Sequence, residues 1–508
     1  MSETTDLVKR SLSDETLAEF ERRVEAQADA LREAIAAGAL DNGEFAVGLE
    51  LEVYAVERDE GGTLTPLSDG VFDGVANKEL GLHNAELNTD PNVLDGDGLA
   101  AQARSIAERF EAGQQDAHDH GEELVADAMW TIPPGTGSKE YLGGHETVDG
   151  VRVAANMRPD PRYIAIDNEV LGLSGGSIDF TAPGAEQSFP SILFESLATS
   201  IQPHLQIPTA EEFPTYYNTA IRTLGPVLAI GTNSPFLPPD LYNAVDDPRR
   251  LVDDTHHELR IAVFEQSVNE SPNPKVRVPC DIDDTTEVVD RVVADDPYAP
   301  FLREWLDDSE RDSFAAEHWE FDYKRSTYWR WLRCVIGGDP VGTGDERSLR
   351  IEYRPIPTQP TVRDVVGMQA LTVGLIRGLV AANHPLTDLP GDAAEDAFYS
   401  AVESGLDADL AWVTADGERT DDSDDIYEEV FEYARRGLRE SGVPEADSDH
   451  YLAPIEARWE AGTTPSAWKK ERVRDHLDAG DSLTDAIEAM QRTYIERSRS
   501  RSSFAEWL

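Results

Sequence analysis

One short stretch constrains the fold of this chain more than any other, residues 45–56, which read FAVGLELEVYAV. Every second residue from Phe45 to Ala55 is apolar, which is the period of a β-strand with one face in a core. Glu50 and Glu52 therefore share the opposite face, about 6–7 Å apart along the strand. In an acid-rich chain most such pairs are solvated surface. Because this pair lies inside an unbroken apolar alternation, we interpret it as part of a polar cleft.

Three further segments repeat the pattern, at residues 83–91, 198–207 and 348–356. Each carries apolar side chains on one face and polar side chains on the other. The polar faces hold Glu86 and Asn88, then Gln202, His204 and Gln206, then Arg350, Glu352 and Arg354. Because Pro203 cannot donate to a ladder, we expect its strand to lie at a sheet edge or at a bulge. The set predicts an antiparallel or mixed sheet with one buried face and one face lining a wet cleft.

Helical patterns flank the predicted sheet. Residues 13–38 have the apolar stripe of an amphipathic helix, with Ser13 as its cap. Residues 361–382 predict a mostly apolar helix buried against the sheet, and short amphipathic helices follow Pro385. The chain is therefore predicted to be α+β, with helices packed on one face of the sheet. We divide it into an N-terminal helix (1–43), a sheet-bearing catalytic domain (44–388) and a helical C-terminal section (389–508).

The charge of the chain indicates its surroundings. Its 99 acidic residues outnumber 44 basic ones and give a formal net charge of −55. The acids are spread along a chain that keeps strand patterns and aromatic residues, so disorder is the poorer interpretation. Such charge repels itself unless salt screens it, which indicates a halophilic protein. It also argues against nucleic acid or an anionic membrane as a partner.

The compartment can be predicted from what the sequence lacks. Only Cys280 and Cys334 occur, too few and too far apart for a disulfide framework or a zinc site. The N-terminal residues show no signal-peptide core, and we expect no stretch long enough to span a bilayer. A cytoplasmic protein is the resulting prediction.

Two groups of residues suggest chemistry on the polar face. Carboxylates with one imidazole and no thiol suit Mg²⁺ or Mn²⁺ better than zinc, so Glu50 and Glu52 are predicted metal ligands. Residues 323–354 hold six arginines in this acidic chain, and arginine grips phosphate and carboxylate groups. The alternative for any one of these arginines is a surface ion pair. Together the two groups suggest phosphoryl transfer from a nucleotide.

Competing motifs do not fit. The chain has no G-x-x-x-x-G-K-[ST] loop, and the glycines of residues 337–344 predict a hairpin loop that would at most cover phosphates. Residues 172–176 match G-x-S-x-G, but no helix pattern follows Ser174. The strand–turn–helix of a serine hydrolase is therefore not predicted.

Five motifs in order give the chain a family resemblance. They are GLELE at 48–52, RY at 162–163 with ATSIQPHL at 198–205, GTNSPF at 231–236, STYWRWLR at 326–333, and LRIEYR at 349–354 with the helix that follows. With these motifs the chain resembles the type 2 glutamate–cysteine ligase (carboxylate–amine ligase) family. The resemblance implies a fold related to the catalytic domain of glutamine synthetase.

The resemblance also implies a reaction. In it ATP phosphorylates the γ-carboxylate of glutamate, and an amine, cysteine in the type reaction, displaces phosphate to form an amide. By position, Glu50, Glu52 and Glu352 match metal ligands, followed by His204 and Glu86. Arg354 and Arg333 would act on the transferring group, and Arg354, Arg350, Arg333 and Arg162 would contact the nucleotide or glutamate. ATP and Mg²⁺ or Mn²⁺ are the implied cofactors.

The sequence departs from the family pattern in two places. Gln202 stands where bacterial members have histidine and His204 where plant members have asparagine, which leaves the number of metals open. An insertion at 172–194 precedes the Gln202 strand and affects the acceptor pocket. A ligase or phosphotransferase of the same fold with another acceptor, and a non-catalytic nucleotide-binding protein, are the alternatives. The oligomeric state is left open.

Overall fold

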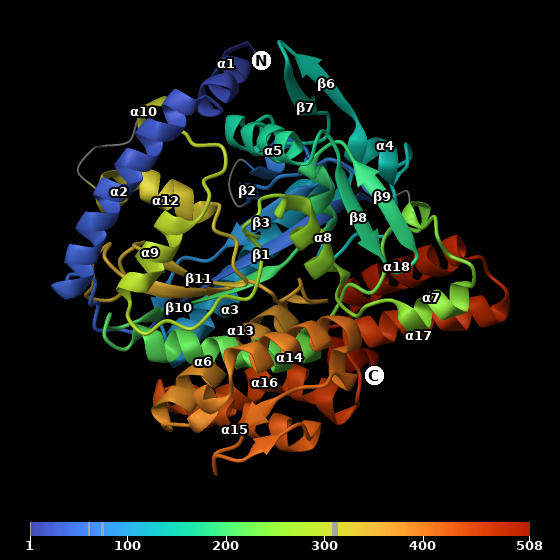
Figure 1. Cartoon of the computed structure of the whole chain (residues 1–508). Coiled ribbons are helices and arrows are strands. Elements are labelled where there is room, and N and C mark those ends of the chain that lie inside the picture. Colours follow the sequence, from blue (N-terminus) through green and yellow to red (C-terminus); the bar gives the residue numbers. More distant parts are fainter. Residues whose placement is uncertain (1, 59–60, 73–75, 307–312) are drawn as a thin grey trace.

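An antiparallel β-sheet forms the centre of the protein (Figure 1), in a computed structural model that describes residues 2–58, 61–72, 76–306 and 313–508. Six of its strands follow the order β11, β12, β10, β1, β3, β2, and β4 and β5 also pair with β1. Their bounds are β1 (Ala46–Glu57), β2 (Asn77–Lys78), β3 (Asn84–Asn88), β4 (Asn92–Val93), β5 (Glu122–Val125), β10 (Ile201–Ile207), β11 (Leu332–Ile336) and β12 (Leu349–Tyr353). Every pairing in this sheet is antiparallel, which agrees with the first of the two predicted forms, antiparallel or mixed.

Strand β1 confirms the pattern seen at residues 45–56. Leu49, Leu51 and Val53 are at most 2 % exposed, on the face opposite Glu50 and Glu52. The same alternation buries one face of β12 and of β3. Because side chains alternate across a strand, the polar residues of β1, β3, β10 and β12 are left on one common face of the sheet.

Of the two places expected for Pro203, the edge strand is wrong and the bulge is confirmed, because the pairing shifts by one residue between His204–Glu352 and Ser200–Pro357. Strand β10 lies inside the sheet, between β12 and β1. Its ladder with β12 ends at the pair His204–Glu352, next to Pro203. The backbone N–H of Ile201 points to the same side, where it donates to Ile356, so residue 203 would also donate toward β12. The proline therefore stands where the ladder has stopped and loses no hydrogen bond of the sheet.

Helix α13 (Val362–Ala381) packs on the apolar face of the sheet, against β10 and β1, and begins at the cap residue Thr361. Helices α3 (Gly96–Asp119) and α6 (Phe213–Gly231) pack beside it. By length and composition α13 could cross a membrane, contrary to the expectation that no stretch was long enough. In the fold, 83 % of its apolar window is buried, as a core helix requires.

Shorter elements cover the polar face and its surroundings (Figure 1). They are α4 (Ser138–Gly143), β6 (His145–Val148), β7 (Val151–Ala154), α5 (Pro161–Leu173), β8 (Ile178–Ala182), β9 (Ala185–Phe189), α7 (Pro248–Asp254), α8 (Leu259–Val268), α9 (Thr286–Ala294), α10 (Arg303–Leu306), α11 (Phe314–Glu317) and α12 (Trp319–Ser326). Ser174 follows the end of α5 and precedes a β-hairpin, so the strand–turn–helix of a nucleophile elbow is absent there.

The two ends of the chain are helical. The N-terminal segment holds two helices where one was predicted, α1 (Ser2–Ser11) and α2 (Asp14–Ala36), and Ser13 caps the second. The C-terminal part holds α14 (Gly391–Ser404), the small hairpin β13 (Trp412–Val413) and β14 (Arg419–Thr420), then α15 (Ser423–Glu440), α16 (Glu445–Glu460), α17 (Pro465–Ala479) and α18 (Leu483–Ser500). One apolar core reaches from Val8 to Ile495, and the three-part division of the chain stays a prediction.

Candidate functional site

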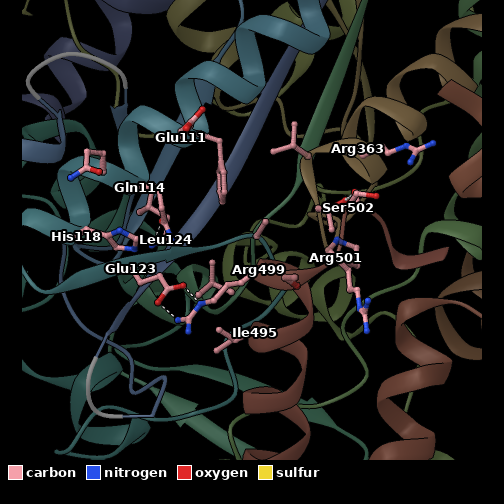
Figure 2. A pocket seen from close by; sticks show the side chains of 18 of the residues that line it. Glu111, Gln114, His118, Glu123, Leu124, Arg363, Ile495, Arg499, Arg501 and Ser502 are labelled. Atoms are coloured by element: carbon pink, nitrogen blue, oxygen red, sulfur yellow. Dashed lines mark hydrogen bonds and ion pairs between the residues drawn. The ribbon is translucent and has the colours of Figure 1, made fainter. Parts of the chain in front are cut away.

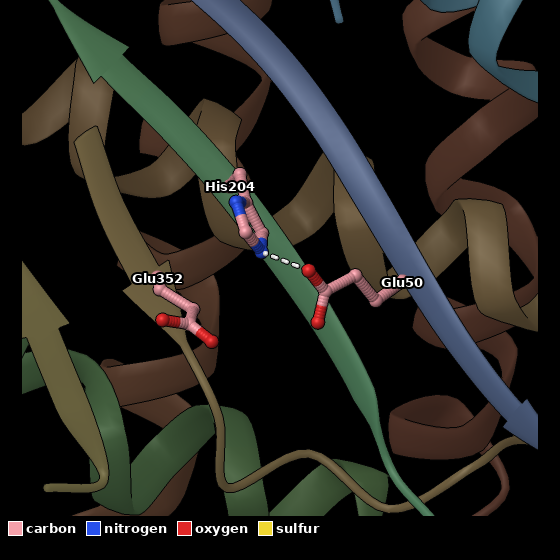
Figure 3. Close-up of side chains that lie close together, drawn as sticks. All are labelled: Glu50, His204 and Glu352. Carbon is pink, nitrogen blue, oxygen red and sulfur yellow. Dashed lines mark ion pairs between the residues drawn. The ribbon is translucent and has the colours of Figure 1, made fainter. Parts of the chain in front are cut away.

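Three predicted metal ligands meet on neighbouring strands (Figure 3). Glu50 comes from β1, His204 from β10 and Glu352 from β12, and each offers one ligand atom within 4.8 Å of the other two. His204 and Glu352 stand opposite each other in the ladder, while Gln202 stands opposite Glu50. The register of the sheet therefore brings together residues that lie 302 positions apart in the chain.

The donor set fits a divalent cation. Nε2 of His204 is buried and makes no hydrogen bond in the described part of the chain, although Oε1 of Glu50 lies 3.3 Å away. Burial would raise the pKa of Glu50, but attraction to His204 and Arg354 together lowers it. The ligand set consists of two carboxylates and one imidazole, whose Nε2 has no hydrogen-bonding partner among the described residues. Such a set suits Mg²⁺ or Mn²⁺.

Two arginines hold Glu352 in place. Arg333 donates to both of its carboxylate oxygens, and Nη1 of Arg354 donates to Oε1 at 2.7 Å. Nη1 of Arg354 also donates to Oε1 of Gln202 at 2.6 Å, which joins β12 to β10. Burial alone would raise the pKa of Glu352, but the two guanidinium groups lower it well below its ordinary value. This carboxylate is therefore ionised and rigidly oriented toward the cluster.

A cavity of about 320 Å³ opens beside this cluster, and we call it the acidic cavity. Glu50, Glu52, Glu79, Glu86, Glu195, Glu352, Arg162, Arg333 and Arg354 supply its charged lining. Glu52 accepts from the backbone N–H of Ser200 at 2.6 Å and from Nε2 of Gln202 at 3.1 Å. Glu52 and Glu86 face each other across β1 and β3, outside the three-residue cluster but inside the same cavity.

The acids of this cavity lack enough cations. Burial, then repulsion from Glu52 and Glu195, raises the pKa of Glu79 to about 8. Burial, then repulsion from Glu52, raises the pKa of Glu195 to about 8. The pKa of Glu86 is raised well above its ordinary value by burial and by its acidic neighbours. Such a concentration of half-buried carboxylates favours the binding of positive charge.

A second cavity of about 320 Å³ meets the acidic cavity at Glu50, which lines both. Its walls include the start of β1, residues 88–91, His204 and the loop after β11, at Gly338 and Asp339. Arg350 also lines it, donating from Nε to Nδ1 of His204 at 3.1 Å and from Nη1 to the carbonyl of Gly337 at 2.7 Å. The predicted hairpin loop of 337–344 therefore borders the site.

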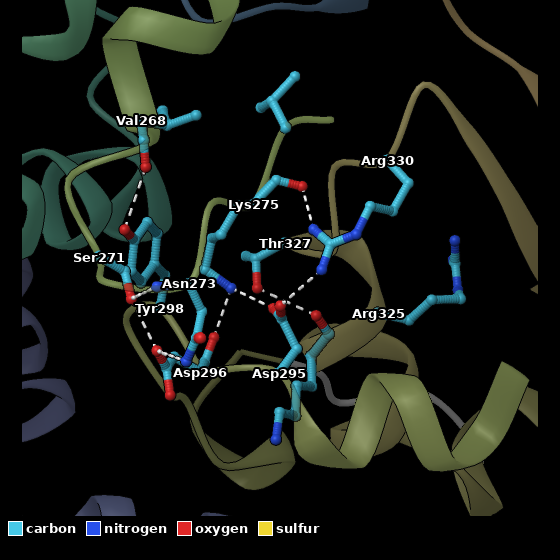
Figure 4. A network of polar contacts seen from close by, with 12 residues as sticks. Val268, Ser271, Asn273, Lys275, Asp295, Asp296, Tyr298, Arg325, Thr327 and Arg330 are labelled. Atoms are coloured by element: carbon cyan, nitrogen blue, oxygen red, sulfur yellow. Dashed lines mark hydrogen bonds and ion pairs between the residues drawn. The ribbon is translucent and has the colours of Figure 1, made fainter. Parts of the chain in front are cut away.

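The remaining arginines have different surroundings. Arg162, in the first turn of α5, lines the acidic cavity and donates from Nη2 to Oγ of Ser326 at 2.6 Å. Arg330 lies in a buried network, donating to Asp295 and to the carbonyl of Lys275, while Lys275 pairs with Asp295 (Figure 4). This network fastens the segment after α8 to the entrance of β11, so Arg330 has a structural place.

Two lining residues, Glu79 and Glu195, escape the sequence argument. Glu79 directly follows the two-residue strand β2, and Glu195 lies in the 3₁₀ helix at Ile192–Leu197. Neither lies in an alternating stretch long enough to assign a face. The one signal in the sequence was the position of Glu195, an acid shortly before the Gln202 strand.

Comparisons with known proteins agree with this geometry. The sequence profile of the glutamate-cysteine ligase family 2 (GCS2) matches residues 46–498. No curated protein sequence matches the chain. Among solved structures, the glutamate–cysteine ligase of Francisella tularensis in complex with AMP is 14 % identical, with 91 % of this chain and 90 % of that chain covered and a TM-score of 0.52. A bifunctional glutathione synthetase from Pasteurella multocida is 13 % identical, with 90 % and 53 % covered and a TM-score of 0.49. The first likeness shows the fold and confirms the predicted fold class.

Proposed function

We propose, since this chain belongs to the glutamate-cysteine ligase family 2 and is a glutamate–cysteine ligase-like enzyme, that it joins the γ-carboxylate of glutamate to the amine of cysteine. ATP would supply the energy and γ-glutamylcysteine would be the product. The observation that carries the proposal is the convergence of Glu50, His204 and Glu352 with Arg333 and Arg354 on adjacent strands.

The metal cluster would position the nucleotide. Glu50, His204 and Glu352 would hold Mg²⁺ or Mn²⁺, and Glu52 with Glu86 and Glu79 supplies carboxylates for a further ion. A bound divalent ion neutralises phosphate charge and orients the γ-phosphate for in-line attack. Arg350 in the second cavity and Arg354 in the acidic cavity flank Glu50, so phosphates reaching this point would meet a guanidinium on either side.

The reaction would then proceed in two steps. A γ-carboxylate oxygen of glutamate bonds to the γ-phosphorus as the bond to the β-phosphate oxygen breaks, which releases ADP. The amine nitrogen, after losing a proton, attacks the acyl carbon, and inorganic phosphate leaves as the amide forms. Arg354 and Arg333 stabilise the charge of the transferring group by preorganised hydrogen bonds.

The acidic cavity suits the other substrate groups. Its half-buried carboxylates, Glu79 and Glu195 among them, would attract the ammonium groups of glutamate and of the amine acceptor. Arg162 stands on the same wall and would bind the α-carboxylate of glutamate. The cavity therefore offers both signs of charge that an amino-acid substrate requires.

The setting of the enzyme is part of the proposal. With 99 acidic and 44 basic residues the folded chain repels itself, and we infer that it works in the salt-rich cytoplasm of a halophile. Folding and activity should then require KCl at molar concentration.

A product assay tests the function. The purified chain in molar KCl receives ATP, Mg²⁺, glutamate and, in separate reactions, cysteine, other amino acids or ammonia, and mass spectrometry identifies the amide. ADP release should require all four components and be greatest with cysteine. Glu50→Gln is the inactive control and Arg104→Gln, an exposed arginine of α3, is the matched folding control. The proposal fails if the native chain forms no glutamyl amide with any acceptor.

A further inference from the structure

A further cavity (Figure 2) shares none of its lining residues with the acidic cavity. Its volume is about 670 Å³, within the range of pockets that bind small organic molecules. The C-terminal half of α3, strand β5, the start of α13 and the end of α18 with the residues after it form its walls. We call it the arginine pocket.

The arginine pocket reverses the charge balance of the chain. Arg58, Arg363, Arg499 and Arg501 line it together with His118, against the two acids Glu111 and Glu123. In the whole chain acids outnumber bases 99 to 44. Four arginines gathered from three distant segments in such a chain are not explained by composition.

Only one of these arginines is neutralised by a direct partner. Arg499 forms an ion pair with Glu123 of β5, which Figure 2 shows inside the pocket. Arg58, Arg363 and Arg501 make no side-chain hydrogen bond or ion pair with any residue that the structure describes. Glu506 lies near enough that Arg501 and Arg363 lower its pKa, yet its carboxylate accepts from Ser502.

Arg363 is the strongest sign of a missing ligand. Its Nε is buried and has no hydrogen-bonding partner within the described ranges, which costs free energy unless a bound group accepts from it. The residue also stands in the first turn of α13, where the helix dipole already favours an anion. The positive charge of Arg363 is stabilised most when a negative group binds between Arg363 and the other arginines of the pocket.

The positive groups repel one another. Burial, then the charges of Arg58 and Arg499, lowers the pKa of His118. Burial, then the charge of Arg58, lowers the pKa of Arg499 although Glu123 pairs with it. An anion of two or more charges would relieve this repulsion, and guanidinium groups bind phosphate oxygens in pairs.

We propose that the arginine pocket is a binding site for a small organic phosphate. Arg58, Arg363, Arg499 and Arg501 supply the positive charge that binds its phosphate group. The apolar side chains of the same wall, Phe110, Leu124 and Ile495 among them, take up its organic part. The site needs no metal, which distinguishes it from a nucleotide bound at Glu50, His204 and Glu352.

Calorimetric titration with inorganic pyrophosphate in EDTA tests the site, because EDTA removes the divalent ion through which a phosphate would bind at Glu50, His204 and Glu352. The native chain should bind pyrophosphate, and Arg501→Gln and Arg363→Gln should each weaken binding roughly tenfold or more. Arg501 is exposed, so its variant leaves the fold intact and keeps the test valid if Arg363→Gln is poorly folded.

The matched control is Arg104→Gln, which removes the same charge from α3 outside the pocket and should leave the affinity unchanged. No binding to the native chain, or equal binding to Arg501→Gln, would overturn the proposal. So would loss of binding in Arg354→Gln, which would place pyrophosphate in the acidic cavity. The assay contains no substrate, so its result does not depend on whether the proposed ligase reaction occurs.

Discussion

The acidic cavity and the arginine pocket gather ionisable side chains of opposite kinds in one protein, acids in the first and arginines in the second. In the acidic cavity Arg333 and Arg354 neutralise Glu352, while Glu79, Glu86 and Glu195 keep raised pKa values. In the arginine pocket Glu123 neutralises Arg499, while Arg363 keeps a buried donor with no partner among the residues that the structure describes. The charged groups that lack a partner among the described residues indicate what each region would bind. The acidic cavity would bind cations and ammonium groups, and the arginine pocket would bind an anion.

The two regions also differ in how they are built. The acidic cavity rests on paired strands, so the register of β1, β10 and β12 fixes which side chains meet. The arginine pocket is assembled from one edge of the sheet at β5, parts of three helices and the residues after α18, and of these only β5 belongs to a ladder. A substitution should therefore act sharply in the first region and more gradually in the second.

The largest effect is expected for Glu50→Gln. It removes the charge that our proposal assigns to the metal and that both site cavities share, so ADP release should fall by about 10²–10³-fold. In EDTA the variant should be less thermally stable than the native chain at neutral pH, because the lowered pKa of Glu50 means that its ionised carboxylate stabilises the fold. A coupled ADP assay and calorimetry measure both. Pyrophosphate binding in EDTA should be unaffected, because Glu50 does not line the arginine pocket. Activity within tenfold of the native value would contradict the role of Glu50 in the acidic cavity.

Arg354→Lys should follow in size. Lysine keeps the charge but cannot donate to Gln202 and Glu352 in the same plane, so kcat should fall about 10²-fold while the fold persists. Steady-state kinetics with varied ATP and glutamate measure the loss. Arg104→Lys is the control, and a change confined to KM would argue against a role in the transition state.

Glu123→Gln tests the other region. Its removal leaves Arg499 without its buried partner beside three further arginines, so the chain should lose about 1–3 kcal/mol of stability. Pyrophosphate should restore part of that loss and should raise the melting temperature more than in the native chain. Denaturant titration with and without the probe decides this. An unchanged midpoint would mean that the pocket tolerates its charge without compensation.

The smallest effect concerns pH. Glu195 holds a proton up to about pH 8 in the folded chain but only to about pH 4.5 when unfolded. The folded state therefore binds more protons in this window, and the free energy of unfolding in EDTA should fall as pH rises through it. Glu195→Gln should flatten the slope, because a neutral amide replaces the protonated acid. A slope identical in both proteins would show that Glu195 titrates normally.

The period of two made the sheet and most of the site predictable from the sequence. Glu50, His204 and Glu352 each sit in a strand whose apolar face is unmistakable, so their common face followed from alternation alone. For Pro203 the sequence left an edge and a bulge open, because it does not say where a neighbouring ladder shifts or stops. Glu195 and the arginine pocket depend on helix ends that meet only through tertiary packing, and no local pattern records such meetings.

The contact between Arg350 and His204 bears on the order in which the site fills. A guanidinium always donates, so Nδ1 of His204 must accept and the imidazole proton must sit on Nε2, facing Glu50. If His204 held the proposed metal through Nε2, its proton would have to sit on Nδ1, which could then no longer accept from Arg350. Triphosphate oxygens are what would draw this arginine away. Ion and nucleotide should then load cooperatively, each lowering the concentration at which the other half-saturates the enzyme.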